Sequence, residues 1–179
     1  MALIPTCPHG AAHRPSRRSV VAGLTAAAAL PAAAAPASAE DARFMRIAIA
    51  EPRRADFPFG AVIVRDGEAI MRGRNRGRAT DDPTAHGEMV AIRRCAARHG
   101  SKAMKGATLY TSGEPCVMCM GAILWCGFGR LVYAASVAQI ATKMNQIMVT
   151  SAEIAAKTPF SHIAITGGVL ADEAMALFK

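Results

Sequence analysis

Hydrophobic positions recur with two different periods along the chain. In residues 41–50 the spacing of Phe44 and Ile47 places both on one side of an amphipathic helix. Short apolar runs rich in β-branched residues indicate strands, and Asp66 and Gly67 between two of these runs are typical of a two-residue hairpin turn. Strands are expected at residues 59–64, 69–75, 107–112, 130–135 and 162–166, and helices at residues 41–50, 85–98, 115–125, 138–146, 151–157 and 170–178.

This order of elements predicts the fold class. Strands that alternate with helices after an initial antiparallel pair indicate one three-layer α/β/α domain with a mixed five-stranded sheet. Pro83 precedes one helix and Pro115 opens another, so His86 and Glu88 fall in the first turn of the first and Cys116 at the start of the second. The inward face of the first of these helices is expected to carry Met89, Ile92 and Ala96, with Cys95 beside them.

Residues 1–39 differ in composition from the rest of the chain. They contain three arginines, no acidic residue and an alanine-rich apolar run that ends at Ala39. Arg17 and Arg18 resemble a twin-arginine signal, which predicts a leader at residues 1–39, a mature domain at residues 40–179 and a periplasmic or secreted protein. The alternatives are a disordered leader, a mis-assigned start codon or a retained anchor, and the first two leave a cytoplasmic protein. The anchor is least expected, because the apolar run is too short to span a bilayer.

The charge balance is basic, with 21 Lys and Arg against 13 Asp and Glu. Without the three arginines of residues 1–39 the surplus falls from eight to five positive charges, which by itself says little about partners. Arginines alternate with other residues at 72, 74, 76 and 78, and period-two geometry places them on one face of a strand and Asn75 on the other for as long as the strand stays extended. Such a row could bind phosphate, although a solvated sheet face or an oligomer contact is commoner.

The cysteines favour a metal site. Four of them lie outside residues 1–39, which would permit two disulfides in an oxidising compartment. Residues 86–88 (HGE) are followed, after 26 residues, by residues 115–119 (PCVMC). Cysteines three positions apart lie on one face of a helix, and the positive N-terminal end of a helix favours their thiolate form.

His86, Cys116 and Cys119 therefore form a candidate set of three ligands for one zinc ion per chain. Three protein ligands leave the fourth tetrahedral position to water, which is typical of a catalytic zinc site. Glu88 is near enough to take a proton from that water and deliver it to a substrate. The alternatives are a disulfide between the two cysteines, or a structural zinc with a fourth ligand from Cys95, Cys126 or His99.

These motifs resemble those of the cytidine deaminase superfamily, in which H-x-E followed by P-C-x-x-C is the zinc deaminase signature. The resemblance is to the branch of bacterial guanine deaminases and tRNA adenosine deaminases, and it extends over residues 42–178. It is carried by residues 58–64 (PFGAVIV), 73–75 (GRN), 83–88 (PTAHGE) and 111–123 (TSGEPCVMCMGAI).

The resemblance implies a cytidine deaminase-like fold, zinc on His86, Cys116 and Cys119, proton transfer by Glu88 and a base-contacting amide at Asn75. It also implies a homodimer. Trp125 resembles an aromatic position of guanine deaminases and is a candidate substrate contact, although a lone Trp on a helix is more often a core residue.

Two departures from the guanine deaminase pattern bear on the substrate. Gly87 replaces the usual alanine, and residues 136–148 carry no carboxylate where a second acid is expected. A Lys-Thr-Gly-Ala-type stretch of the tRNA enzymes is missing too, and export would separate the protein from tRNA. We therefore expect hydrolytic deamination of a purine-type base or nucleoside. The alternatives are a tRNA adenosine deaminase, a deaminase of another aminated heterocycle such as a pterin or triazine, and a zinc-stabilised nucleic-acid-binding module without catalysis.

Overall fold

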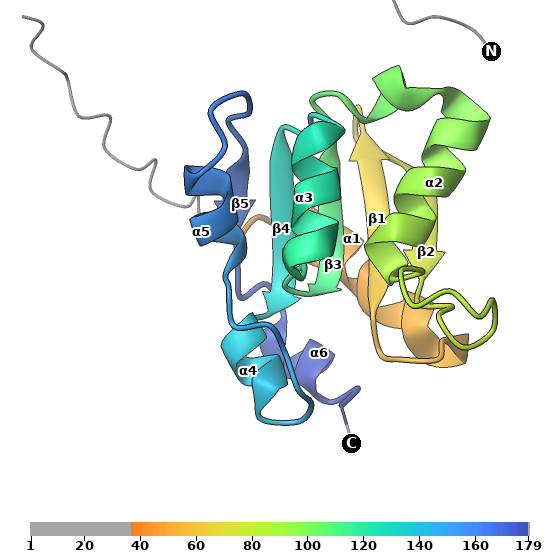
Figure 1. Ribbon diagram of the computed structural model, residues 1–179, viewed down its shortest axis with the longest axis vertical. Coiled ribbons are helices and arrows are strands. Elements are labelled where there is room, and N and C mark those ends of the chain that lie inside the picture. Colours follow the sequence, from red (N-terminus) through yellow and green to blue (C-terminus); the bar gives the residue numbers. More distant parts are fainter. Residues whose placement is uncertain (1–36, 179) are drawn as a thin grey trace, which may run out of the picture. The chain divides into compact units, whose positions relative to one another are not determined.

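The structure is a computed structural model that describes residues 37–178. Its strands are β1 (Gly60–Arg65), β2 (Glu68–Arg74), β3 (Thr108–Gly113), β4 (Arg130–Ala135) and β5 (Ala164–Thr166). Its α-helices are α1 (Ala39–Ala50), α2 (Gly87–His99), α3 (Val117–Trp125), α4 (Val137–Ala141), α5 (Ser151–Ala156) and α6 (Ala171–Met175). Two short 3-10 helices are η1 (Glu51–Arg54) and η2 (Ser101–Met104). The sheet has the order β2-β1-β3-β4-β5 (Figure 1). β1 is antiparallel to β2 and β3, whereas β3, β4 and β5 are parallel.

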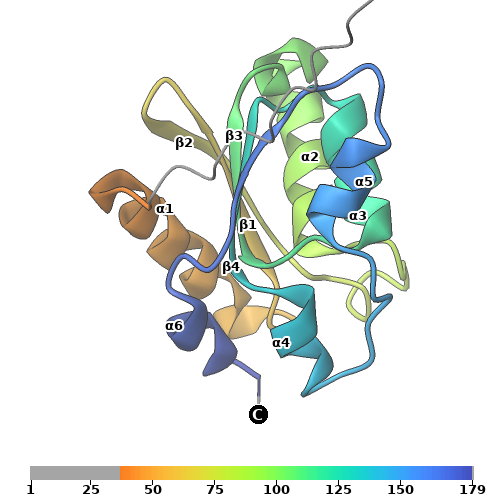
Figure 2. The ribbon, with the colours of Figure 1, turned by 90° about the vertical axis from the view of Figure 1, so that its left-hand side faces the viewer.

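Helices cover both faces of this sheet. α2, α3 and α5 lie on one face, and α1 and α6 lie on the other (Figure 2). Neighbouring residues of a strand point to opposite faces, so Leu131 of β4 is buried with Ile92 and Met120 while Val132 is buried with Phe44. The predicted three-layer α/β/α fold with a mixed five-stranded sheet is confirmed.

The turn between β1 and β2 is the predicted hairpin. Asp66 and Gly67 have φ angles of 51° and 76°, and positive values at both central residues are typical of a type I′ turn. The turn places Arg65 opposite Glu68 and so sets the register of the antiparallel pair.

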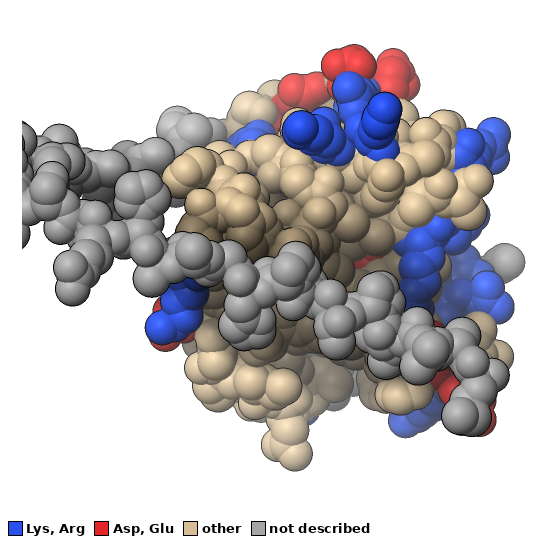
Figure 3. All heavy atoms as spheres, turned by 45° about the horizontal axis from the view of Figure 1, so that its top comes forward, with Lys and Arg blue, Asp and Glu red and all other residues tan. Residues whose placement is uncertain are grey.

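The arginines at residues 72–78 share one face only while the strand stays extended, and buried Gly73 and Asn75 alternate with them over that part. β2 ends at Arg74, and the chain then turns, so the later members of the row no longer alternate with the strand. Arg72 forms an ion pair with Glu51 at 3.5 Å. On the surface seen in Figure 3, basic side chains occur in separate groups, some of them beside acidic ones, and form no continuous stripe.

The inward face of helix α2 is confirmed in part, because Ile92 and Cys95 are buried as expected. The helix begins after His86, and it buries Ala91 instead of Ala96, which is exposed, while Met89 is only half-buried. Gly73 of β2 explains this choice, because a Cβ atom there would lie 2.5 Å from the backbone nitrogen of Ala91. The absence of a side chain lets the sheet and this side of the helix approach closely.

The other helices differ from expectation mainly at their ends. Pro115 precedes Cys116, which is the N-cap residue of α3, so Pro115 is outside the helix. α4 ends at Ala141 instead of residue 146, and residues 142–150 form a loop without regular structure. This early end matters for function, because the loop forms part of the pocket described below.

The predicted leader lies mostly outside the described residues, which begin at residue 37. The predicted boundary before Glu40 falls within the first turn of α1, where Ser38 is the N-cap and exchanges capping hydrogen bonds with Asp41. Within residues 37–178, no helix is both long and apolar enough to cross a membrane.

Asp41 links the start of α1 to the sheet. Its carboxylate is 1% exposed and accepts two hydrogen bonds from the Arg130 guanidinium, at 2.7 and 2.9 Å, and one from the Tyr110 hydroxyl at 2.9 Å. Burial alone would raise the pKa of Asp41, but the hydrogen bonds from Arg130, from the Ser38 backbone and from Tyr110 outweigh it and lower the pKa to about 2.

We expect Asp41→Asn to lower the free energy of unfolding at pH 7 by about 2–4 kcal/mol, because it leaves the partly buried Arg130 without its counter-ion. Since the folded-state pKa of Asp41 lies below its unfolded value, this contribution is present above about pH 4 and is lost as the pH falls towards 2. Urea unfolding at pH 7 and pH 3 measures both effects. Glu40→Gln, on the exposed side of the same turn, is the control, and equal stabilities of Asp41→Asn and wild type at pH 7 would contradict the prediction.

Candidate metal centre and active site

Two helix N-termini bring the predicted zinc ligands together. His86 is the N-cap of α2 and Cys116 the N-cap of α3, and Cys119 lies in the first turn of α3. The Sγ atoms of both cysteines lie 3.6 Å from Nδ1 of His86. All three potential ligand atoms lie within 4.8 Å of one another. The parallel pairing of β3 with β4 places this cluster at the carboxyl edge of the sheet, where open α/β sheets bind ligands.

This cluster fits a zinc ion by the chemistry of its donors. Two sulfurs and one imidazole nitrogen converge, and zinc favours thiolate and imidazole ligands. The ligand group found among the described residues contains neither Cys95, Cys126 nor His99, so the geometry is that of a three-ligand site. All four described cysteines are free thiols, which argues against the disulfide alternative.

The electrostatics of the cluster favour an anionic sulfur at Cys116 and a protonated one at Cys119. The Cys119 thiol hydrogen-bonds to Cys116, and this bond together with His86 lowers the pKa of Cys116 to about 4 despite burial. The same bond and burial raise the pKa of Cys119. The bond to Cys116 also raises the pKa of His86. A cation placed among these groups would replace the proton that the two sulfurs share.

Glu88 lies beside the cluster in the first turn of α2 and is 5% exposed. Burial raises the pKa of this carboxyl to about 7. A carboxyl in such surroundings can hold or release a proton near neutral pH, which is what a general acid and base requires.

Gly87 separates His86 from Glu88 and has a packing role. A Cβ atom at this position would lie 2.9 Å from the carbonyl oxygen of Phe59 and 3.3 Å from Cα of Gly60. The glycine therefore lets the start of β1 approach the metal cluster. This contact gives the departure from alanine at this position a packing explanation.

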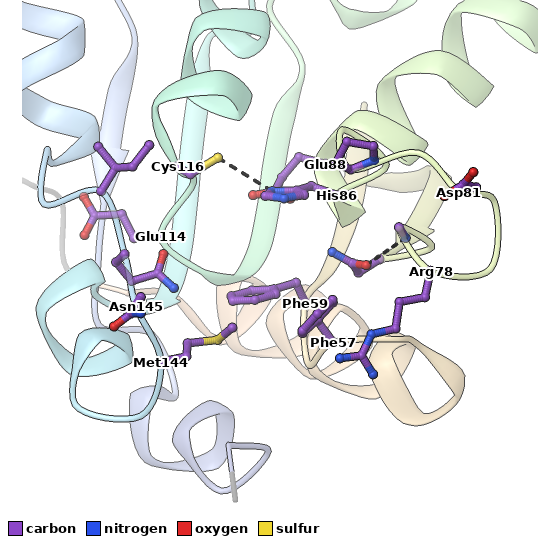
Figure 4. Close-up of a pocket in the computed structure, with 15 residues that line it drawn as sticks. Phe57, Phe59, Arg78, Asp81, His86, Glu88, Glu114, Cys116, Met144 and Asn145 are labelled. Atoms are coloured by element: carbon purple, nitrogen blue, oxygen red, sulfur yellow. Dashed lines mark hydrogen bonds between the residues drawn. The ribbon is translucent and has the colours of Figure 1, made fainter.

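A pocket of about 550 Å³ opens onto the cluster, which is within the size range of small-molecule sites (Figure 4). Asn75 lines this pocket and is 4% exposed. Its Oδ1 accepts a hydrogen bond from the backbone N–H of Gly77 at 3.0 Å. This bond uses the amide oxygen of Asn75 and leaves its NH₂ group as a donor at the pocket.

Several lining residues were not singled out in the sequence. Phe57 and Phe59 form an apolar wall, and the Arg78 guanidinium lies over the Phe57 ring at 4.8 Å. The facing wall includes Met144, Asn145, Gln146 and Ile147, from the loop after α4, and Glu114 (Figure 4). Phe59 and Glu114 lie within the motifs that carry the family resemblance and Arg78 belongs to the arginine row, whereas Phe57 and residues 144–147 had no sequence signal.

Trp125 is not brought to the pocket. It lies at the far end of α3 from Cys116, is 78% exposed and stacks on Phe160 with ring centroids 4.5 Å apart. The Trp125 ring therefore lies neither in the pocket, as a substrate contact would, nor in the core.

The fold and the three-ligand cluster together define a metal-binding α/β/α domain with an open site. The sequence matches, over residues 38–135, the family described as the cytidine and deoxycytidylate deaminase zinc-binding region, and the chain belongs to this family.

Named relatives agree with this assignment. The chain is 49% identical over 78 residues to a guanine deaminase of Bacillus subtilis, covering 44% of this chain and 50% of the relative. It is 43% identical over 101 residues to a tRNA-specific adenosine deaminase of Agrobacterium fabrum, covering 54% of this chain and 66% of the relative. It thus spans half to two thirds of the length of these relatives. A crystal structure of a mutant protein in complex with 8-azaguanine has a TM-score of 0.67 and 28% identity, over 79% of this chain and 82% of that one.

Proposed function

We propose that this protein is a zinc-dependent hydrolytic deaminase that replaces an exocyclic amine of a purine-type base or nucleoside with oxygen and releases ammonia. The observation that carries this proposal is the convergence of His86, Cys116 and Cys119 beside the buried Glu88, at one pocket. A zinc ion held by the three ligands supplies a Lewis acid that activates water at neutral pH.

In this proposal the protein side chains position the ring and move the protons. Glu88 accepts one proton from the attacking water and delivers it to a ring nitrogen, and then takes the second proton from the newly bound hydroxyl group and delivers it to the departing amine, so that a carbon–oxygen bond forms, a carbon–nitrogen bond breaks and ammonia leaves. Asn75 donates from its amide NH₂ to an acceptor on the ring, and Phe57 and Phe59 exclude water from one side of the pocket.

A guanine-like small molecule is the favoured substrate. The Bacillus subtilis relative is a guanine deaminase, and the crystal structure described above holds the guanine analogue 8-azaguanine. The pocket has a volume suited to one heterocycle, and its loop wall of Met144, Asn145, Gln146 and Ile147 carries no charge. The adenosine deaminase relative and Arg78 at the pocket keep tRNA as the second candidate.

A panel of amines tests the substrate. Zinc-loaded protein is incubated with guanine, adenine, cytosine, their nucleosides, an amino-substituted pterin, an amino-substituted triazine and an anticodon stem-loop RNA. The ammonia released from each compound is measured. We expect guanine to give the highest kcat/KM, by about 10-fold or more over the other bases. Highest activity on the stem-loop would favour the tRNA candidate, and no ammonia from any compound would contradict the proposed function.

We also propose that the protein is a homodimer in which the outer side of α3 contacts the second copy. Val117 and Trp125 are exposed on this helix, and Trp125 with Phe160 forms an exposed aromatic pair. Exposed aromatic clusters of this kind are typical of protein interfaces.

Trp125→Ala is expected to weaken this dimer by about 30-fold or more, because an interface Trp commonly provides a large share of the binding energy. Light scattering after size-exclusion chromatography over a concentration series measures the change. Met148→Ala, which removes another exposed apolar side chain outside α3, is the matched control. A dimer unaffected by Trp125→Ala would contradict the assignment of this surface.

Export remains a proposal that rests on the sequence of residues 1–39 alone. Cleavage before Glu40 would remove Ser38 and its capping hydrogen bond to the start of α1, at a cost of about 1 kcal/mol. N-terminal sequencing of protein recovered from the periplasm or medium tests it. A new terminus at Glu40 is expected, and recovery of protein with Met1 only in the cytoplasm would contradict it.

A further inference from the structure

Glu114 is a pocket residue to which the proposed proton transfers assign no role. It follows β3 directly and is 7% exposed. In Figure 4 it lies with Met144 and Asn145 on the side of the pocket away from Arg78 and Asp81.

Both carboxylate oxygens of Glu114 accept backbone hydrogen bonds. Oε2 accepts from the N–H of Val137, the first residue of α4, and Oε1 accepts from the N–H of Ser151, the first residue of α5, each at 2.8 Å. The backbone N–H of Glu114 donates to the carbonyl of Ala135, at the end of β4, at 2.7 Å. One residue therefore bonds to the end of a strand and to the starts of two consecutive helices, 23 and 37 positions further along the chain.

Between the two helix starts lies the loop that forms the pocket wall. Residues 144–147 of this loop line the pocket. Ile147 and Met148 are 64% and 59% exposed, so this part of the loop has little core packing of its own. Because the same buried carboxylate binds the chain before and after the loop, it fixes the distance between the two ends of the segment 137–151.

We propose that Glu114 is a positioning residue that holds the wall of residues 144–147 in the conformation that receives the substrate. The role in substrate binding rests on the proposed deaminase function. Glu114→Ala leaves two buried N–H groups without an acceptor, which is costly because both lost bonds were made to a charged group. Glu114→Gln keeps one acceptor oxygen but directs an NH₂ group at the other N–H, so a smaller effect is expected.

Hydrogen exchange measured by mass spectrometry tests the positioning role independently of catalysis. In zinc-loaded protein we expect peptides that cover residues 137–151 to exchange about 10- to 100-fold faster in Glu114→Ala than in wild type, with a smaller increase in Glu114→Gln. Glu153→Gln is the matched control, because Glu153 caps the same helix α5 through Thr150 but is exposed and does not bond to α4. Unchanged exchange in both Glu114 variants would overturn the proposal. If Glu114→Ala does not fold, the exchange rate of Glu114→Gln alone tests the proposal.

Kinetics separate positioning from a general loss of structure. With the substrate identified by the amine panel, KM is expected to rise about 10-fold or more in Glu114→Ala while kcat stays within about 3-fold and the zinc content is unchanged. A fall in kcat with unchanged KM, or loss of zinc, would contradict the positioning role. If wild-type protein releases no ammonia from any compound, the proposed function fails, and the exchange experiment still decides whether Glu114 holds the loop.

Discussion

Replacing Glu88 with glutamine is expected to lower kcat/KM by about 10²- to 10⁴-fold, the usual contribution of a general acid and base. The amide has nearly the same shape as the carboxyl and fills the same buried position, but it cannot accept and return a proton. His86, Cys116 and Cys119 are untouched, so one zinc ion per chain should remain. Initial rates of ammonia release, together with zinc analysis of the same sample, measure both quantities.

Glu153→Gln is a suitable control for this variant too, because it makes the same chemical change at an exposed site outside the pocket. It should retain wild-type rates. If Glu88→Gln kept more than about a tenth of wild-type activity while fully loaded with zinc, another group would have to move the protons. If it lost its zinc, the loss of activity would be a structural effect.

Replacing Cys119 with serine is expected to abolish activity through loss of the metal. A serine hydroxyl stays protonated near neutral pH and is a poor zinc ligand, and the two remaining ligands do not retain the ion. We expect zinc affinity to fall by about 100-fold or more and ammonia release to fall below detection. Competition with a fluorescent chelator measures the affinity, and a lower melting temperature should accompany it, because bound metal stabilises the folded state.

The chain offers a cysteine of matched chemistry for comparison. Cys126 lies at the other end of the same helix α3, is half-buried and is a free thiol outside the ligand cluster. Cys126→Ser should keep its zinc and its activity. Equal zinc affinity in Cys119→Ser and Cys126→Ser would contradict the assignment of Cys119 as a ligand.

Much of this fold could be predicted because its signals are local. The hairpin at Asp66 and Gly67 depends on two residues, and each strand has a short apolar run. The metal cluster could be predicted for the same reason, since His86 and Cys116 each begin a helix directly after a proline-containing turn. The short spacing within each motif was enough to predict that these residues lie at helix ends, and the strand order of the sheet was not needed.

What could not be predicted depends on contacts between distant segments. The face of α2 is set by the close approach of Gly73 to Ala91, which no periodicity in α2 reveals. The alternation of the arginines with the strand ends at Arg74, because β2 ends there. Trp125 stacks on Phe160 at the surface and does not reach the pocket.

The pocket wall formed by the loop after α4 could not be predicted from the sequence either. Residues 144–147 have no motif of their own, and they reach the pocket because α4 ends early. The bonds from Glu114 to Val137 and Ser151 cross 23 and 37 positions of sequence, so the motif around Cys116 shows the carboxylate but not its partners.

The role of zinc held by His86, Cys116 and Cys119 is the basis of the proposed deamination. It is tested most directly by titrating metal-free protein with zinc and measuring ammonia released from guanine and the other amines at each step. We expect the rate to rise in proportion to bound zinc and to stop rising at one ion per chain. Full zinc occupancy without ammonia release, or a rate that does not depend on zinc, would contradict this role.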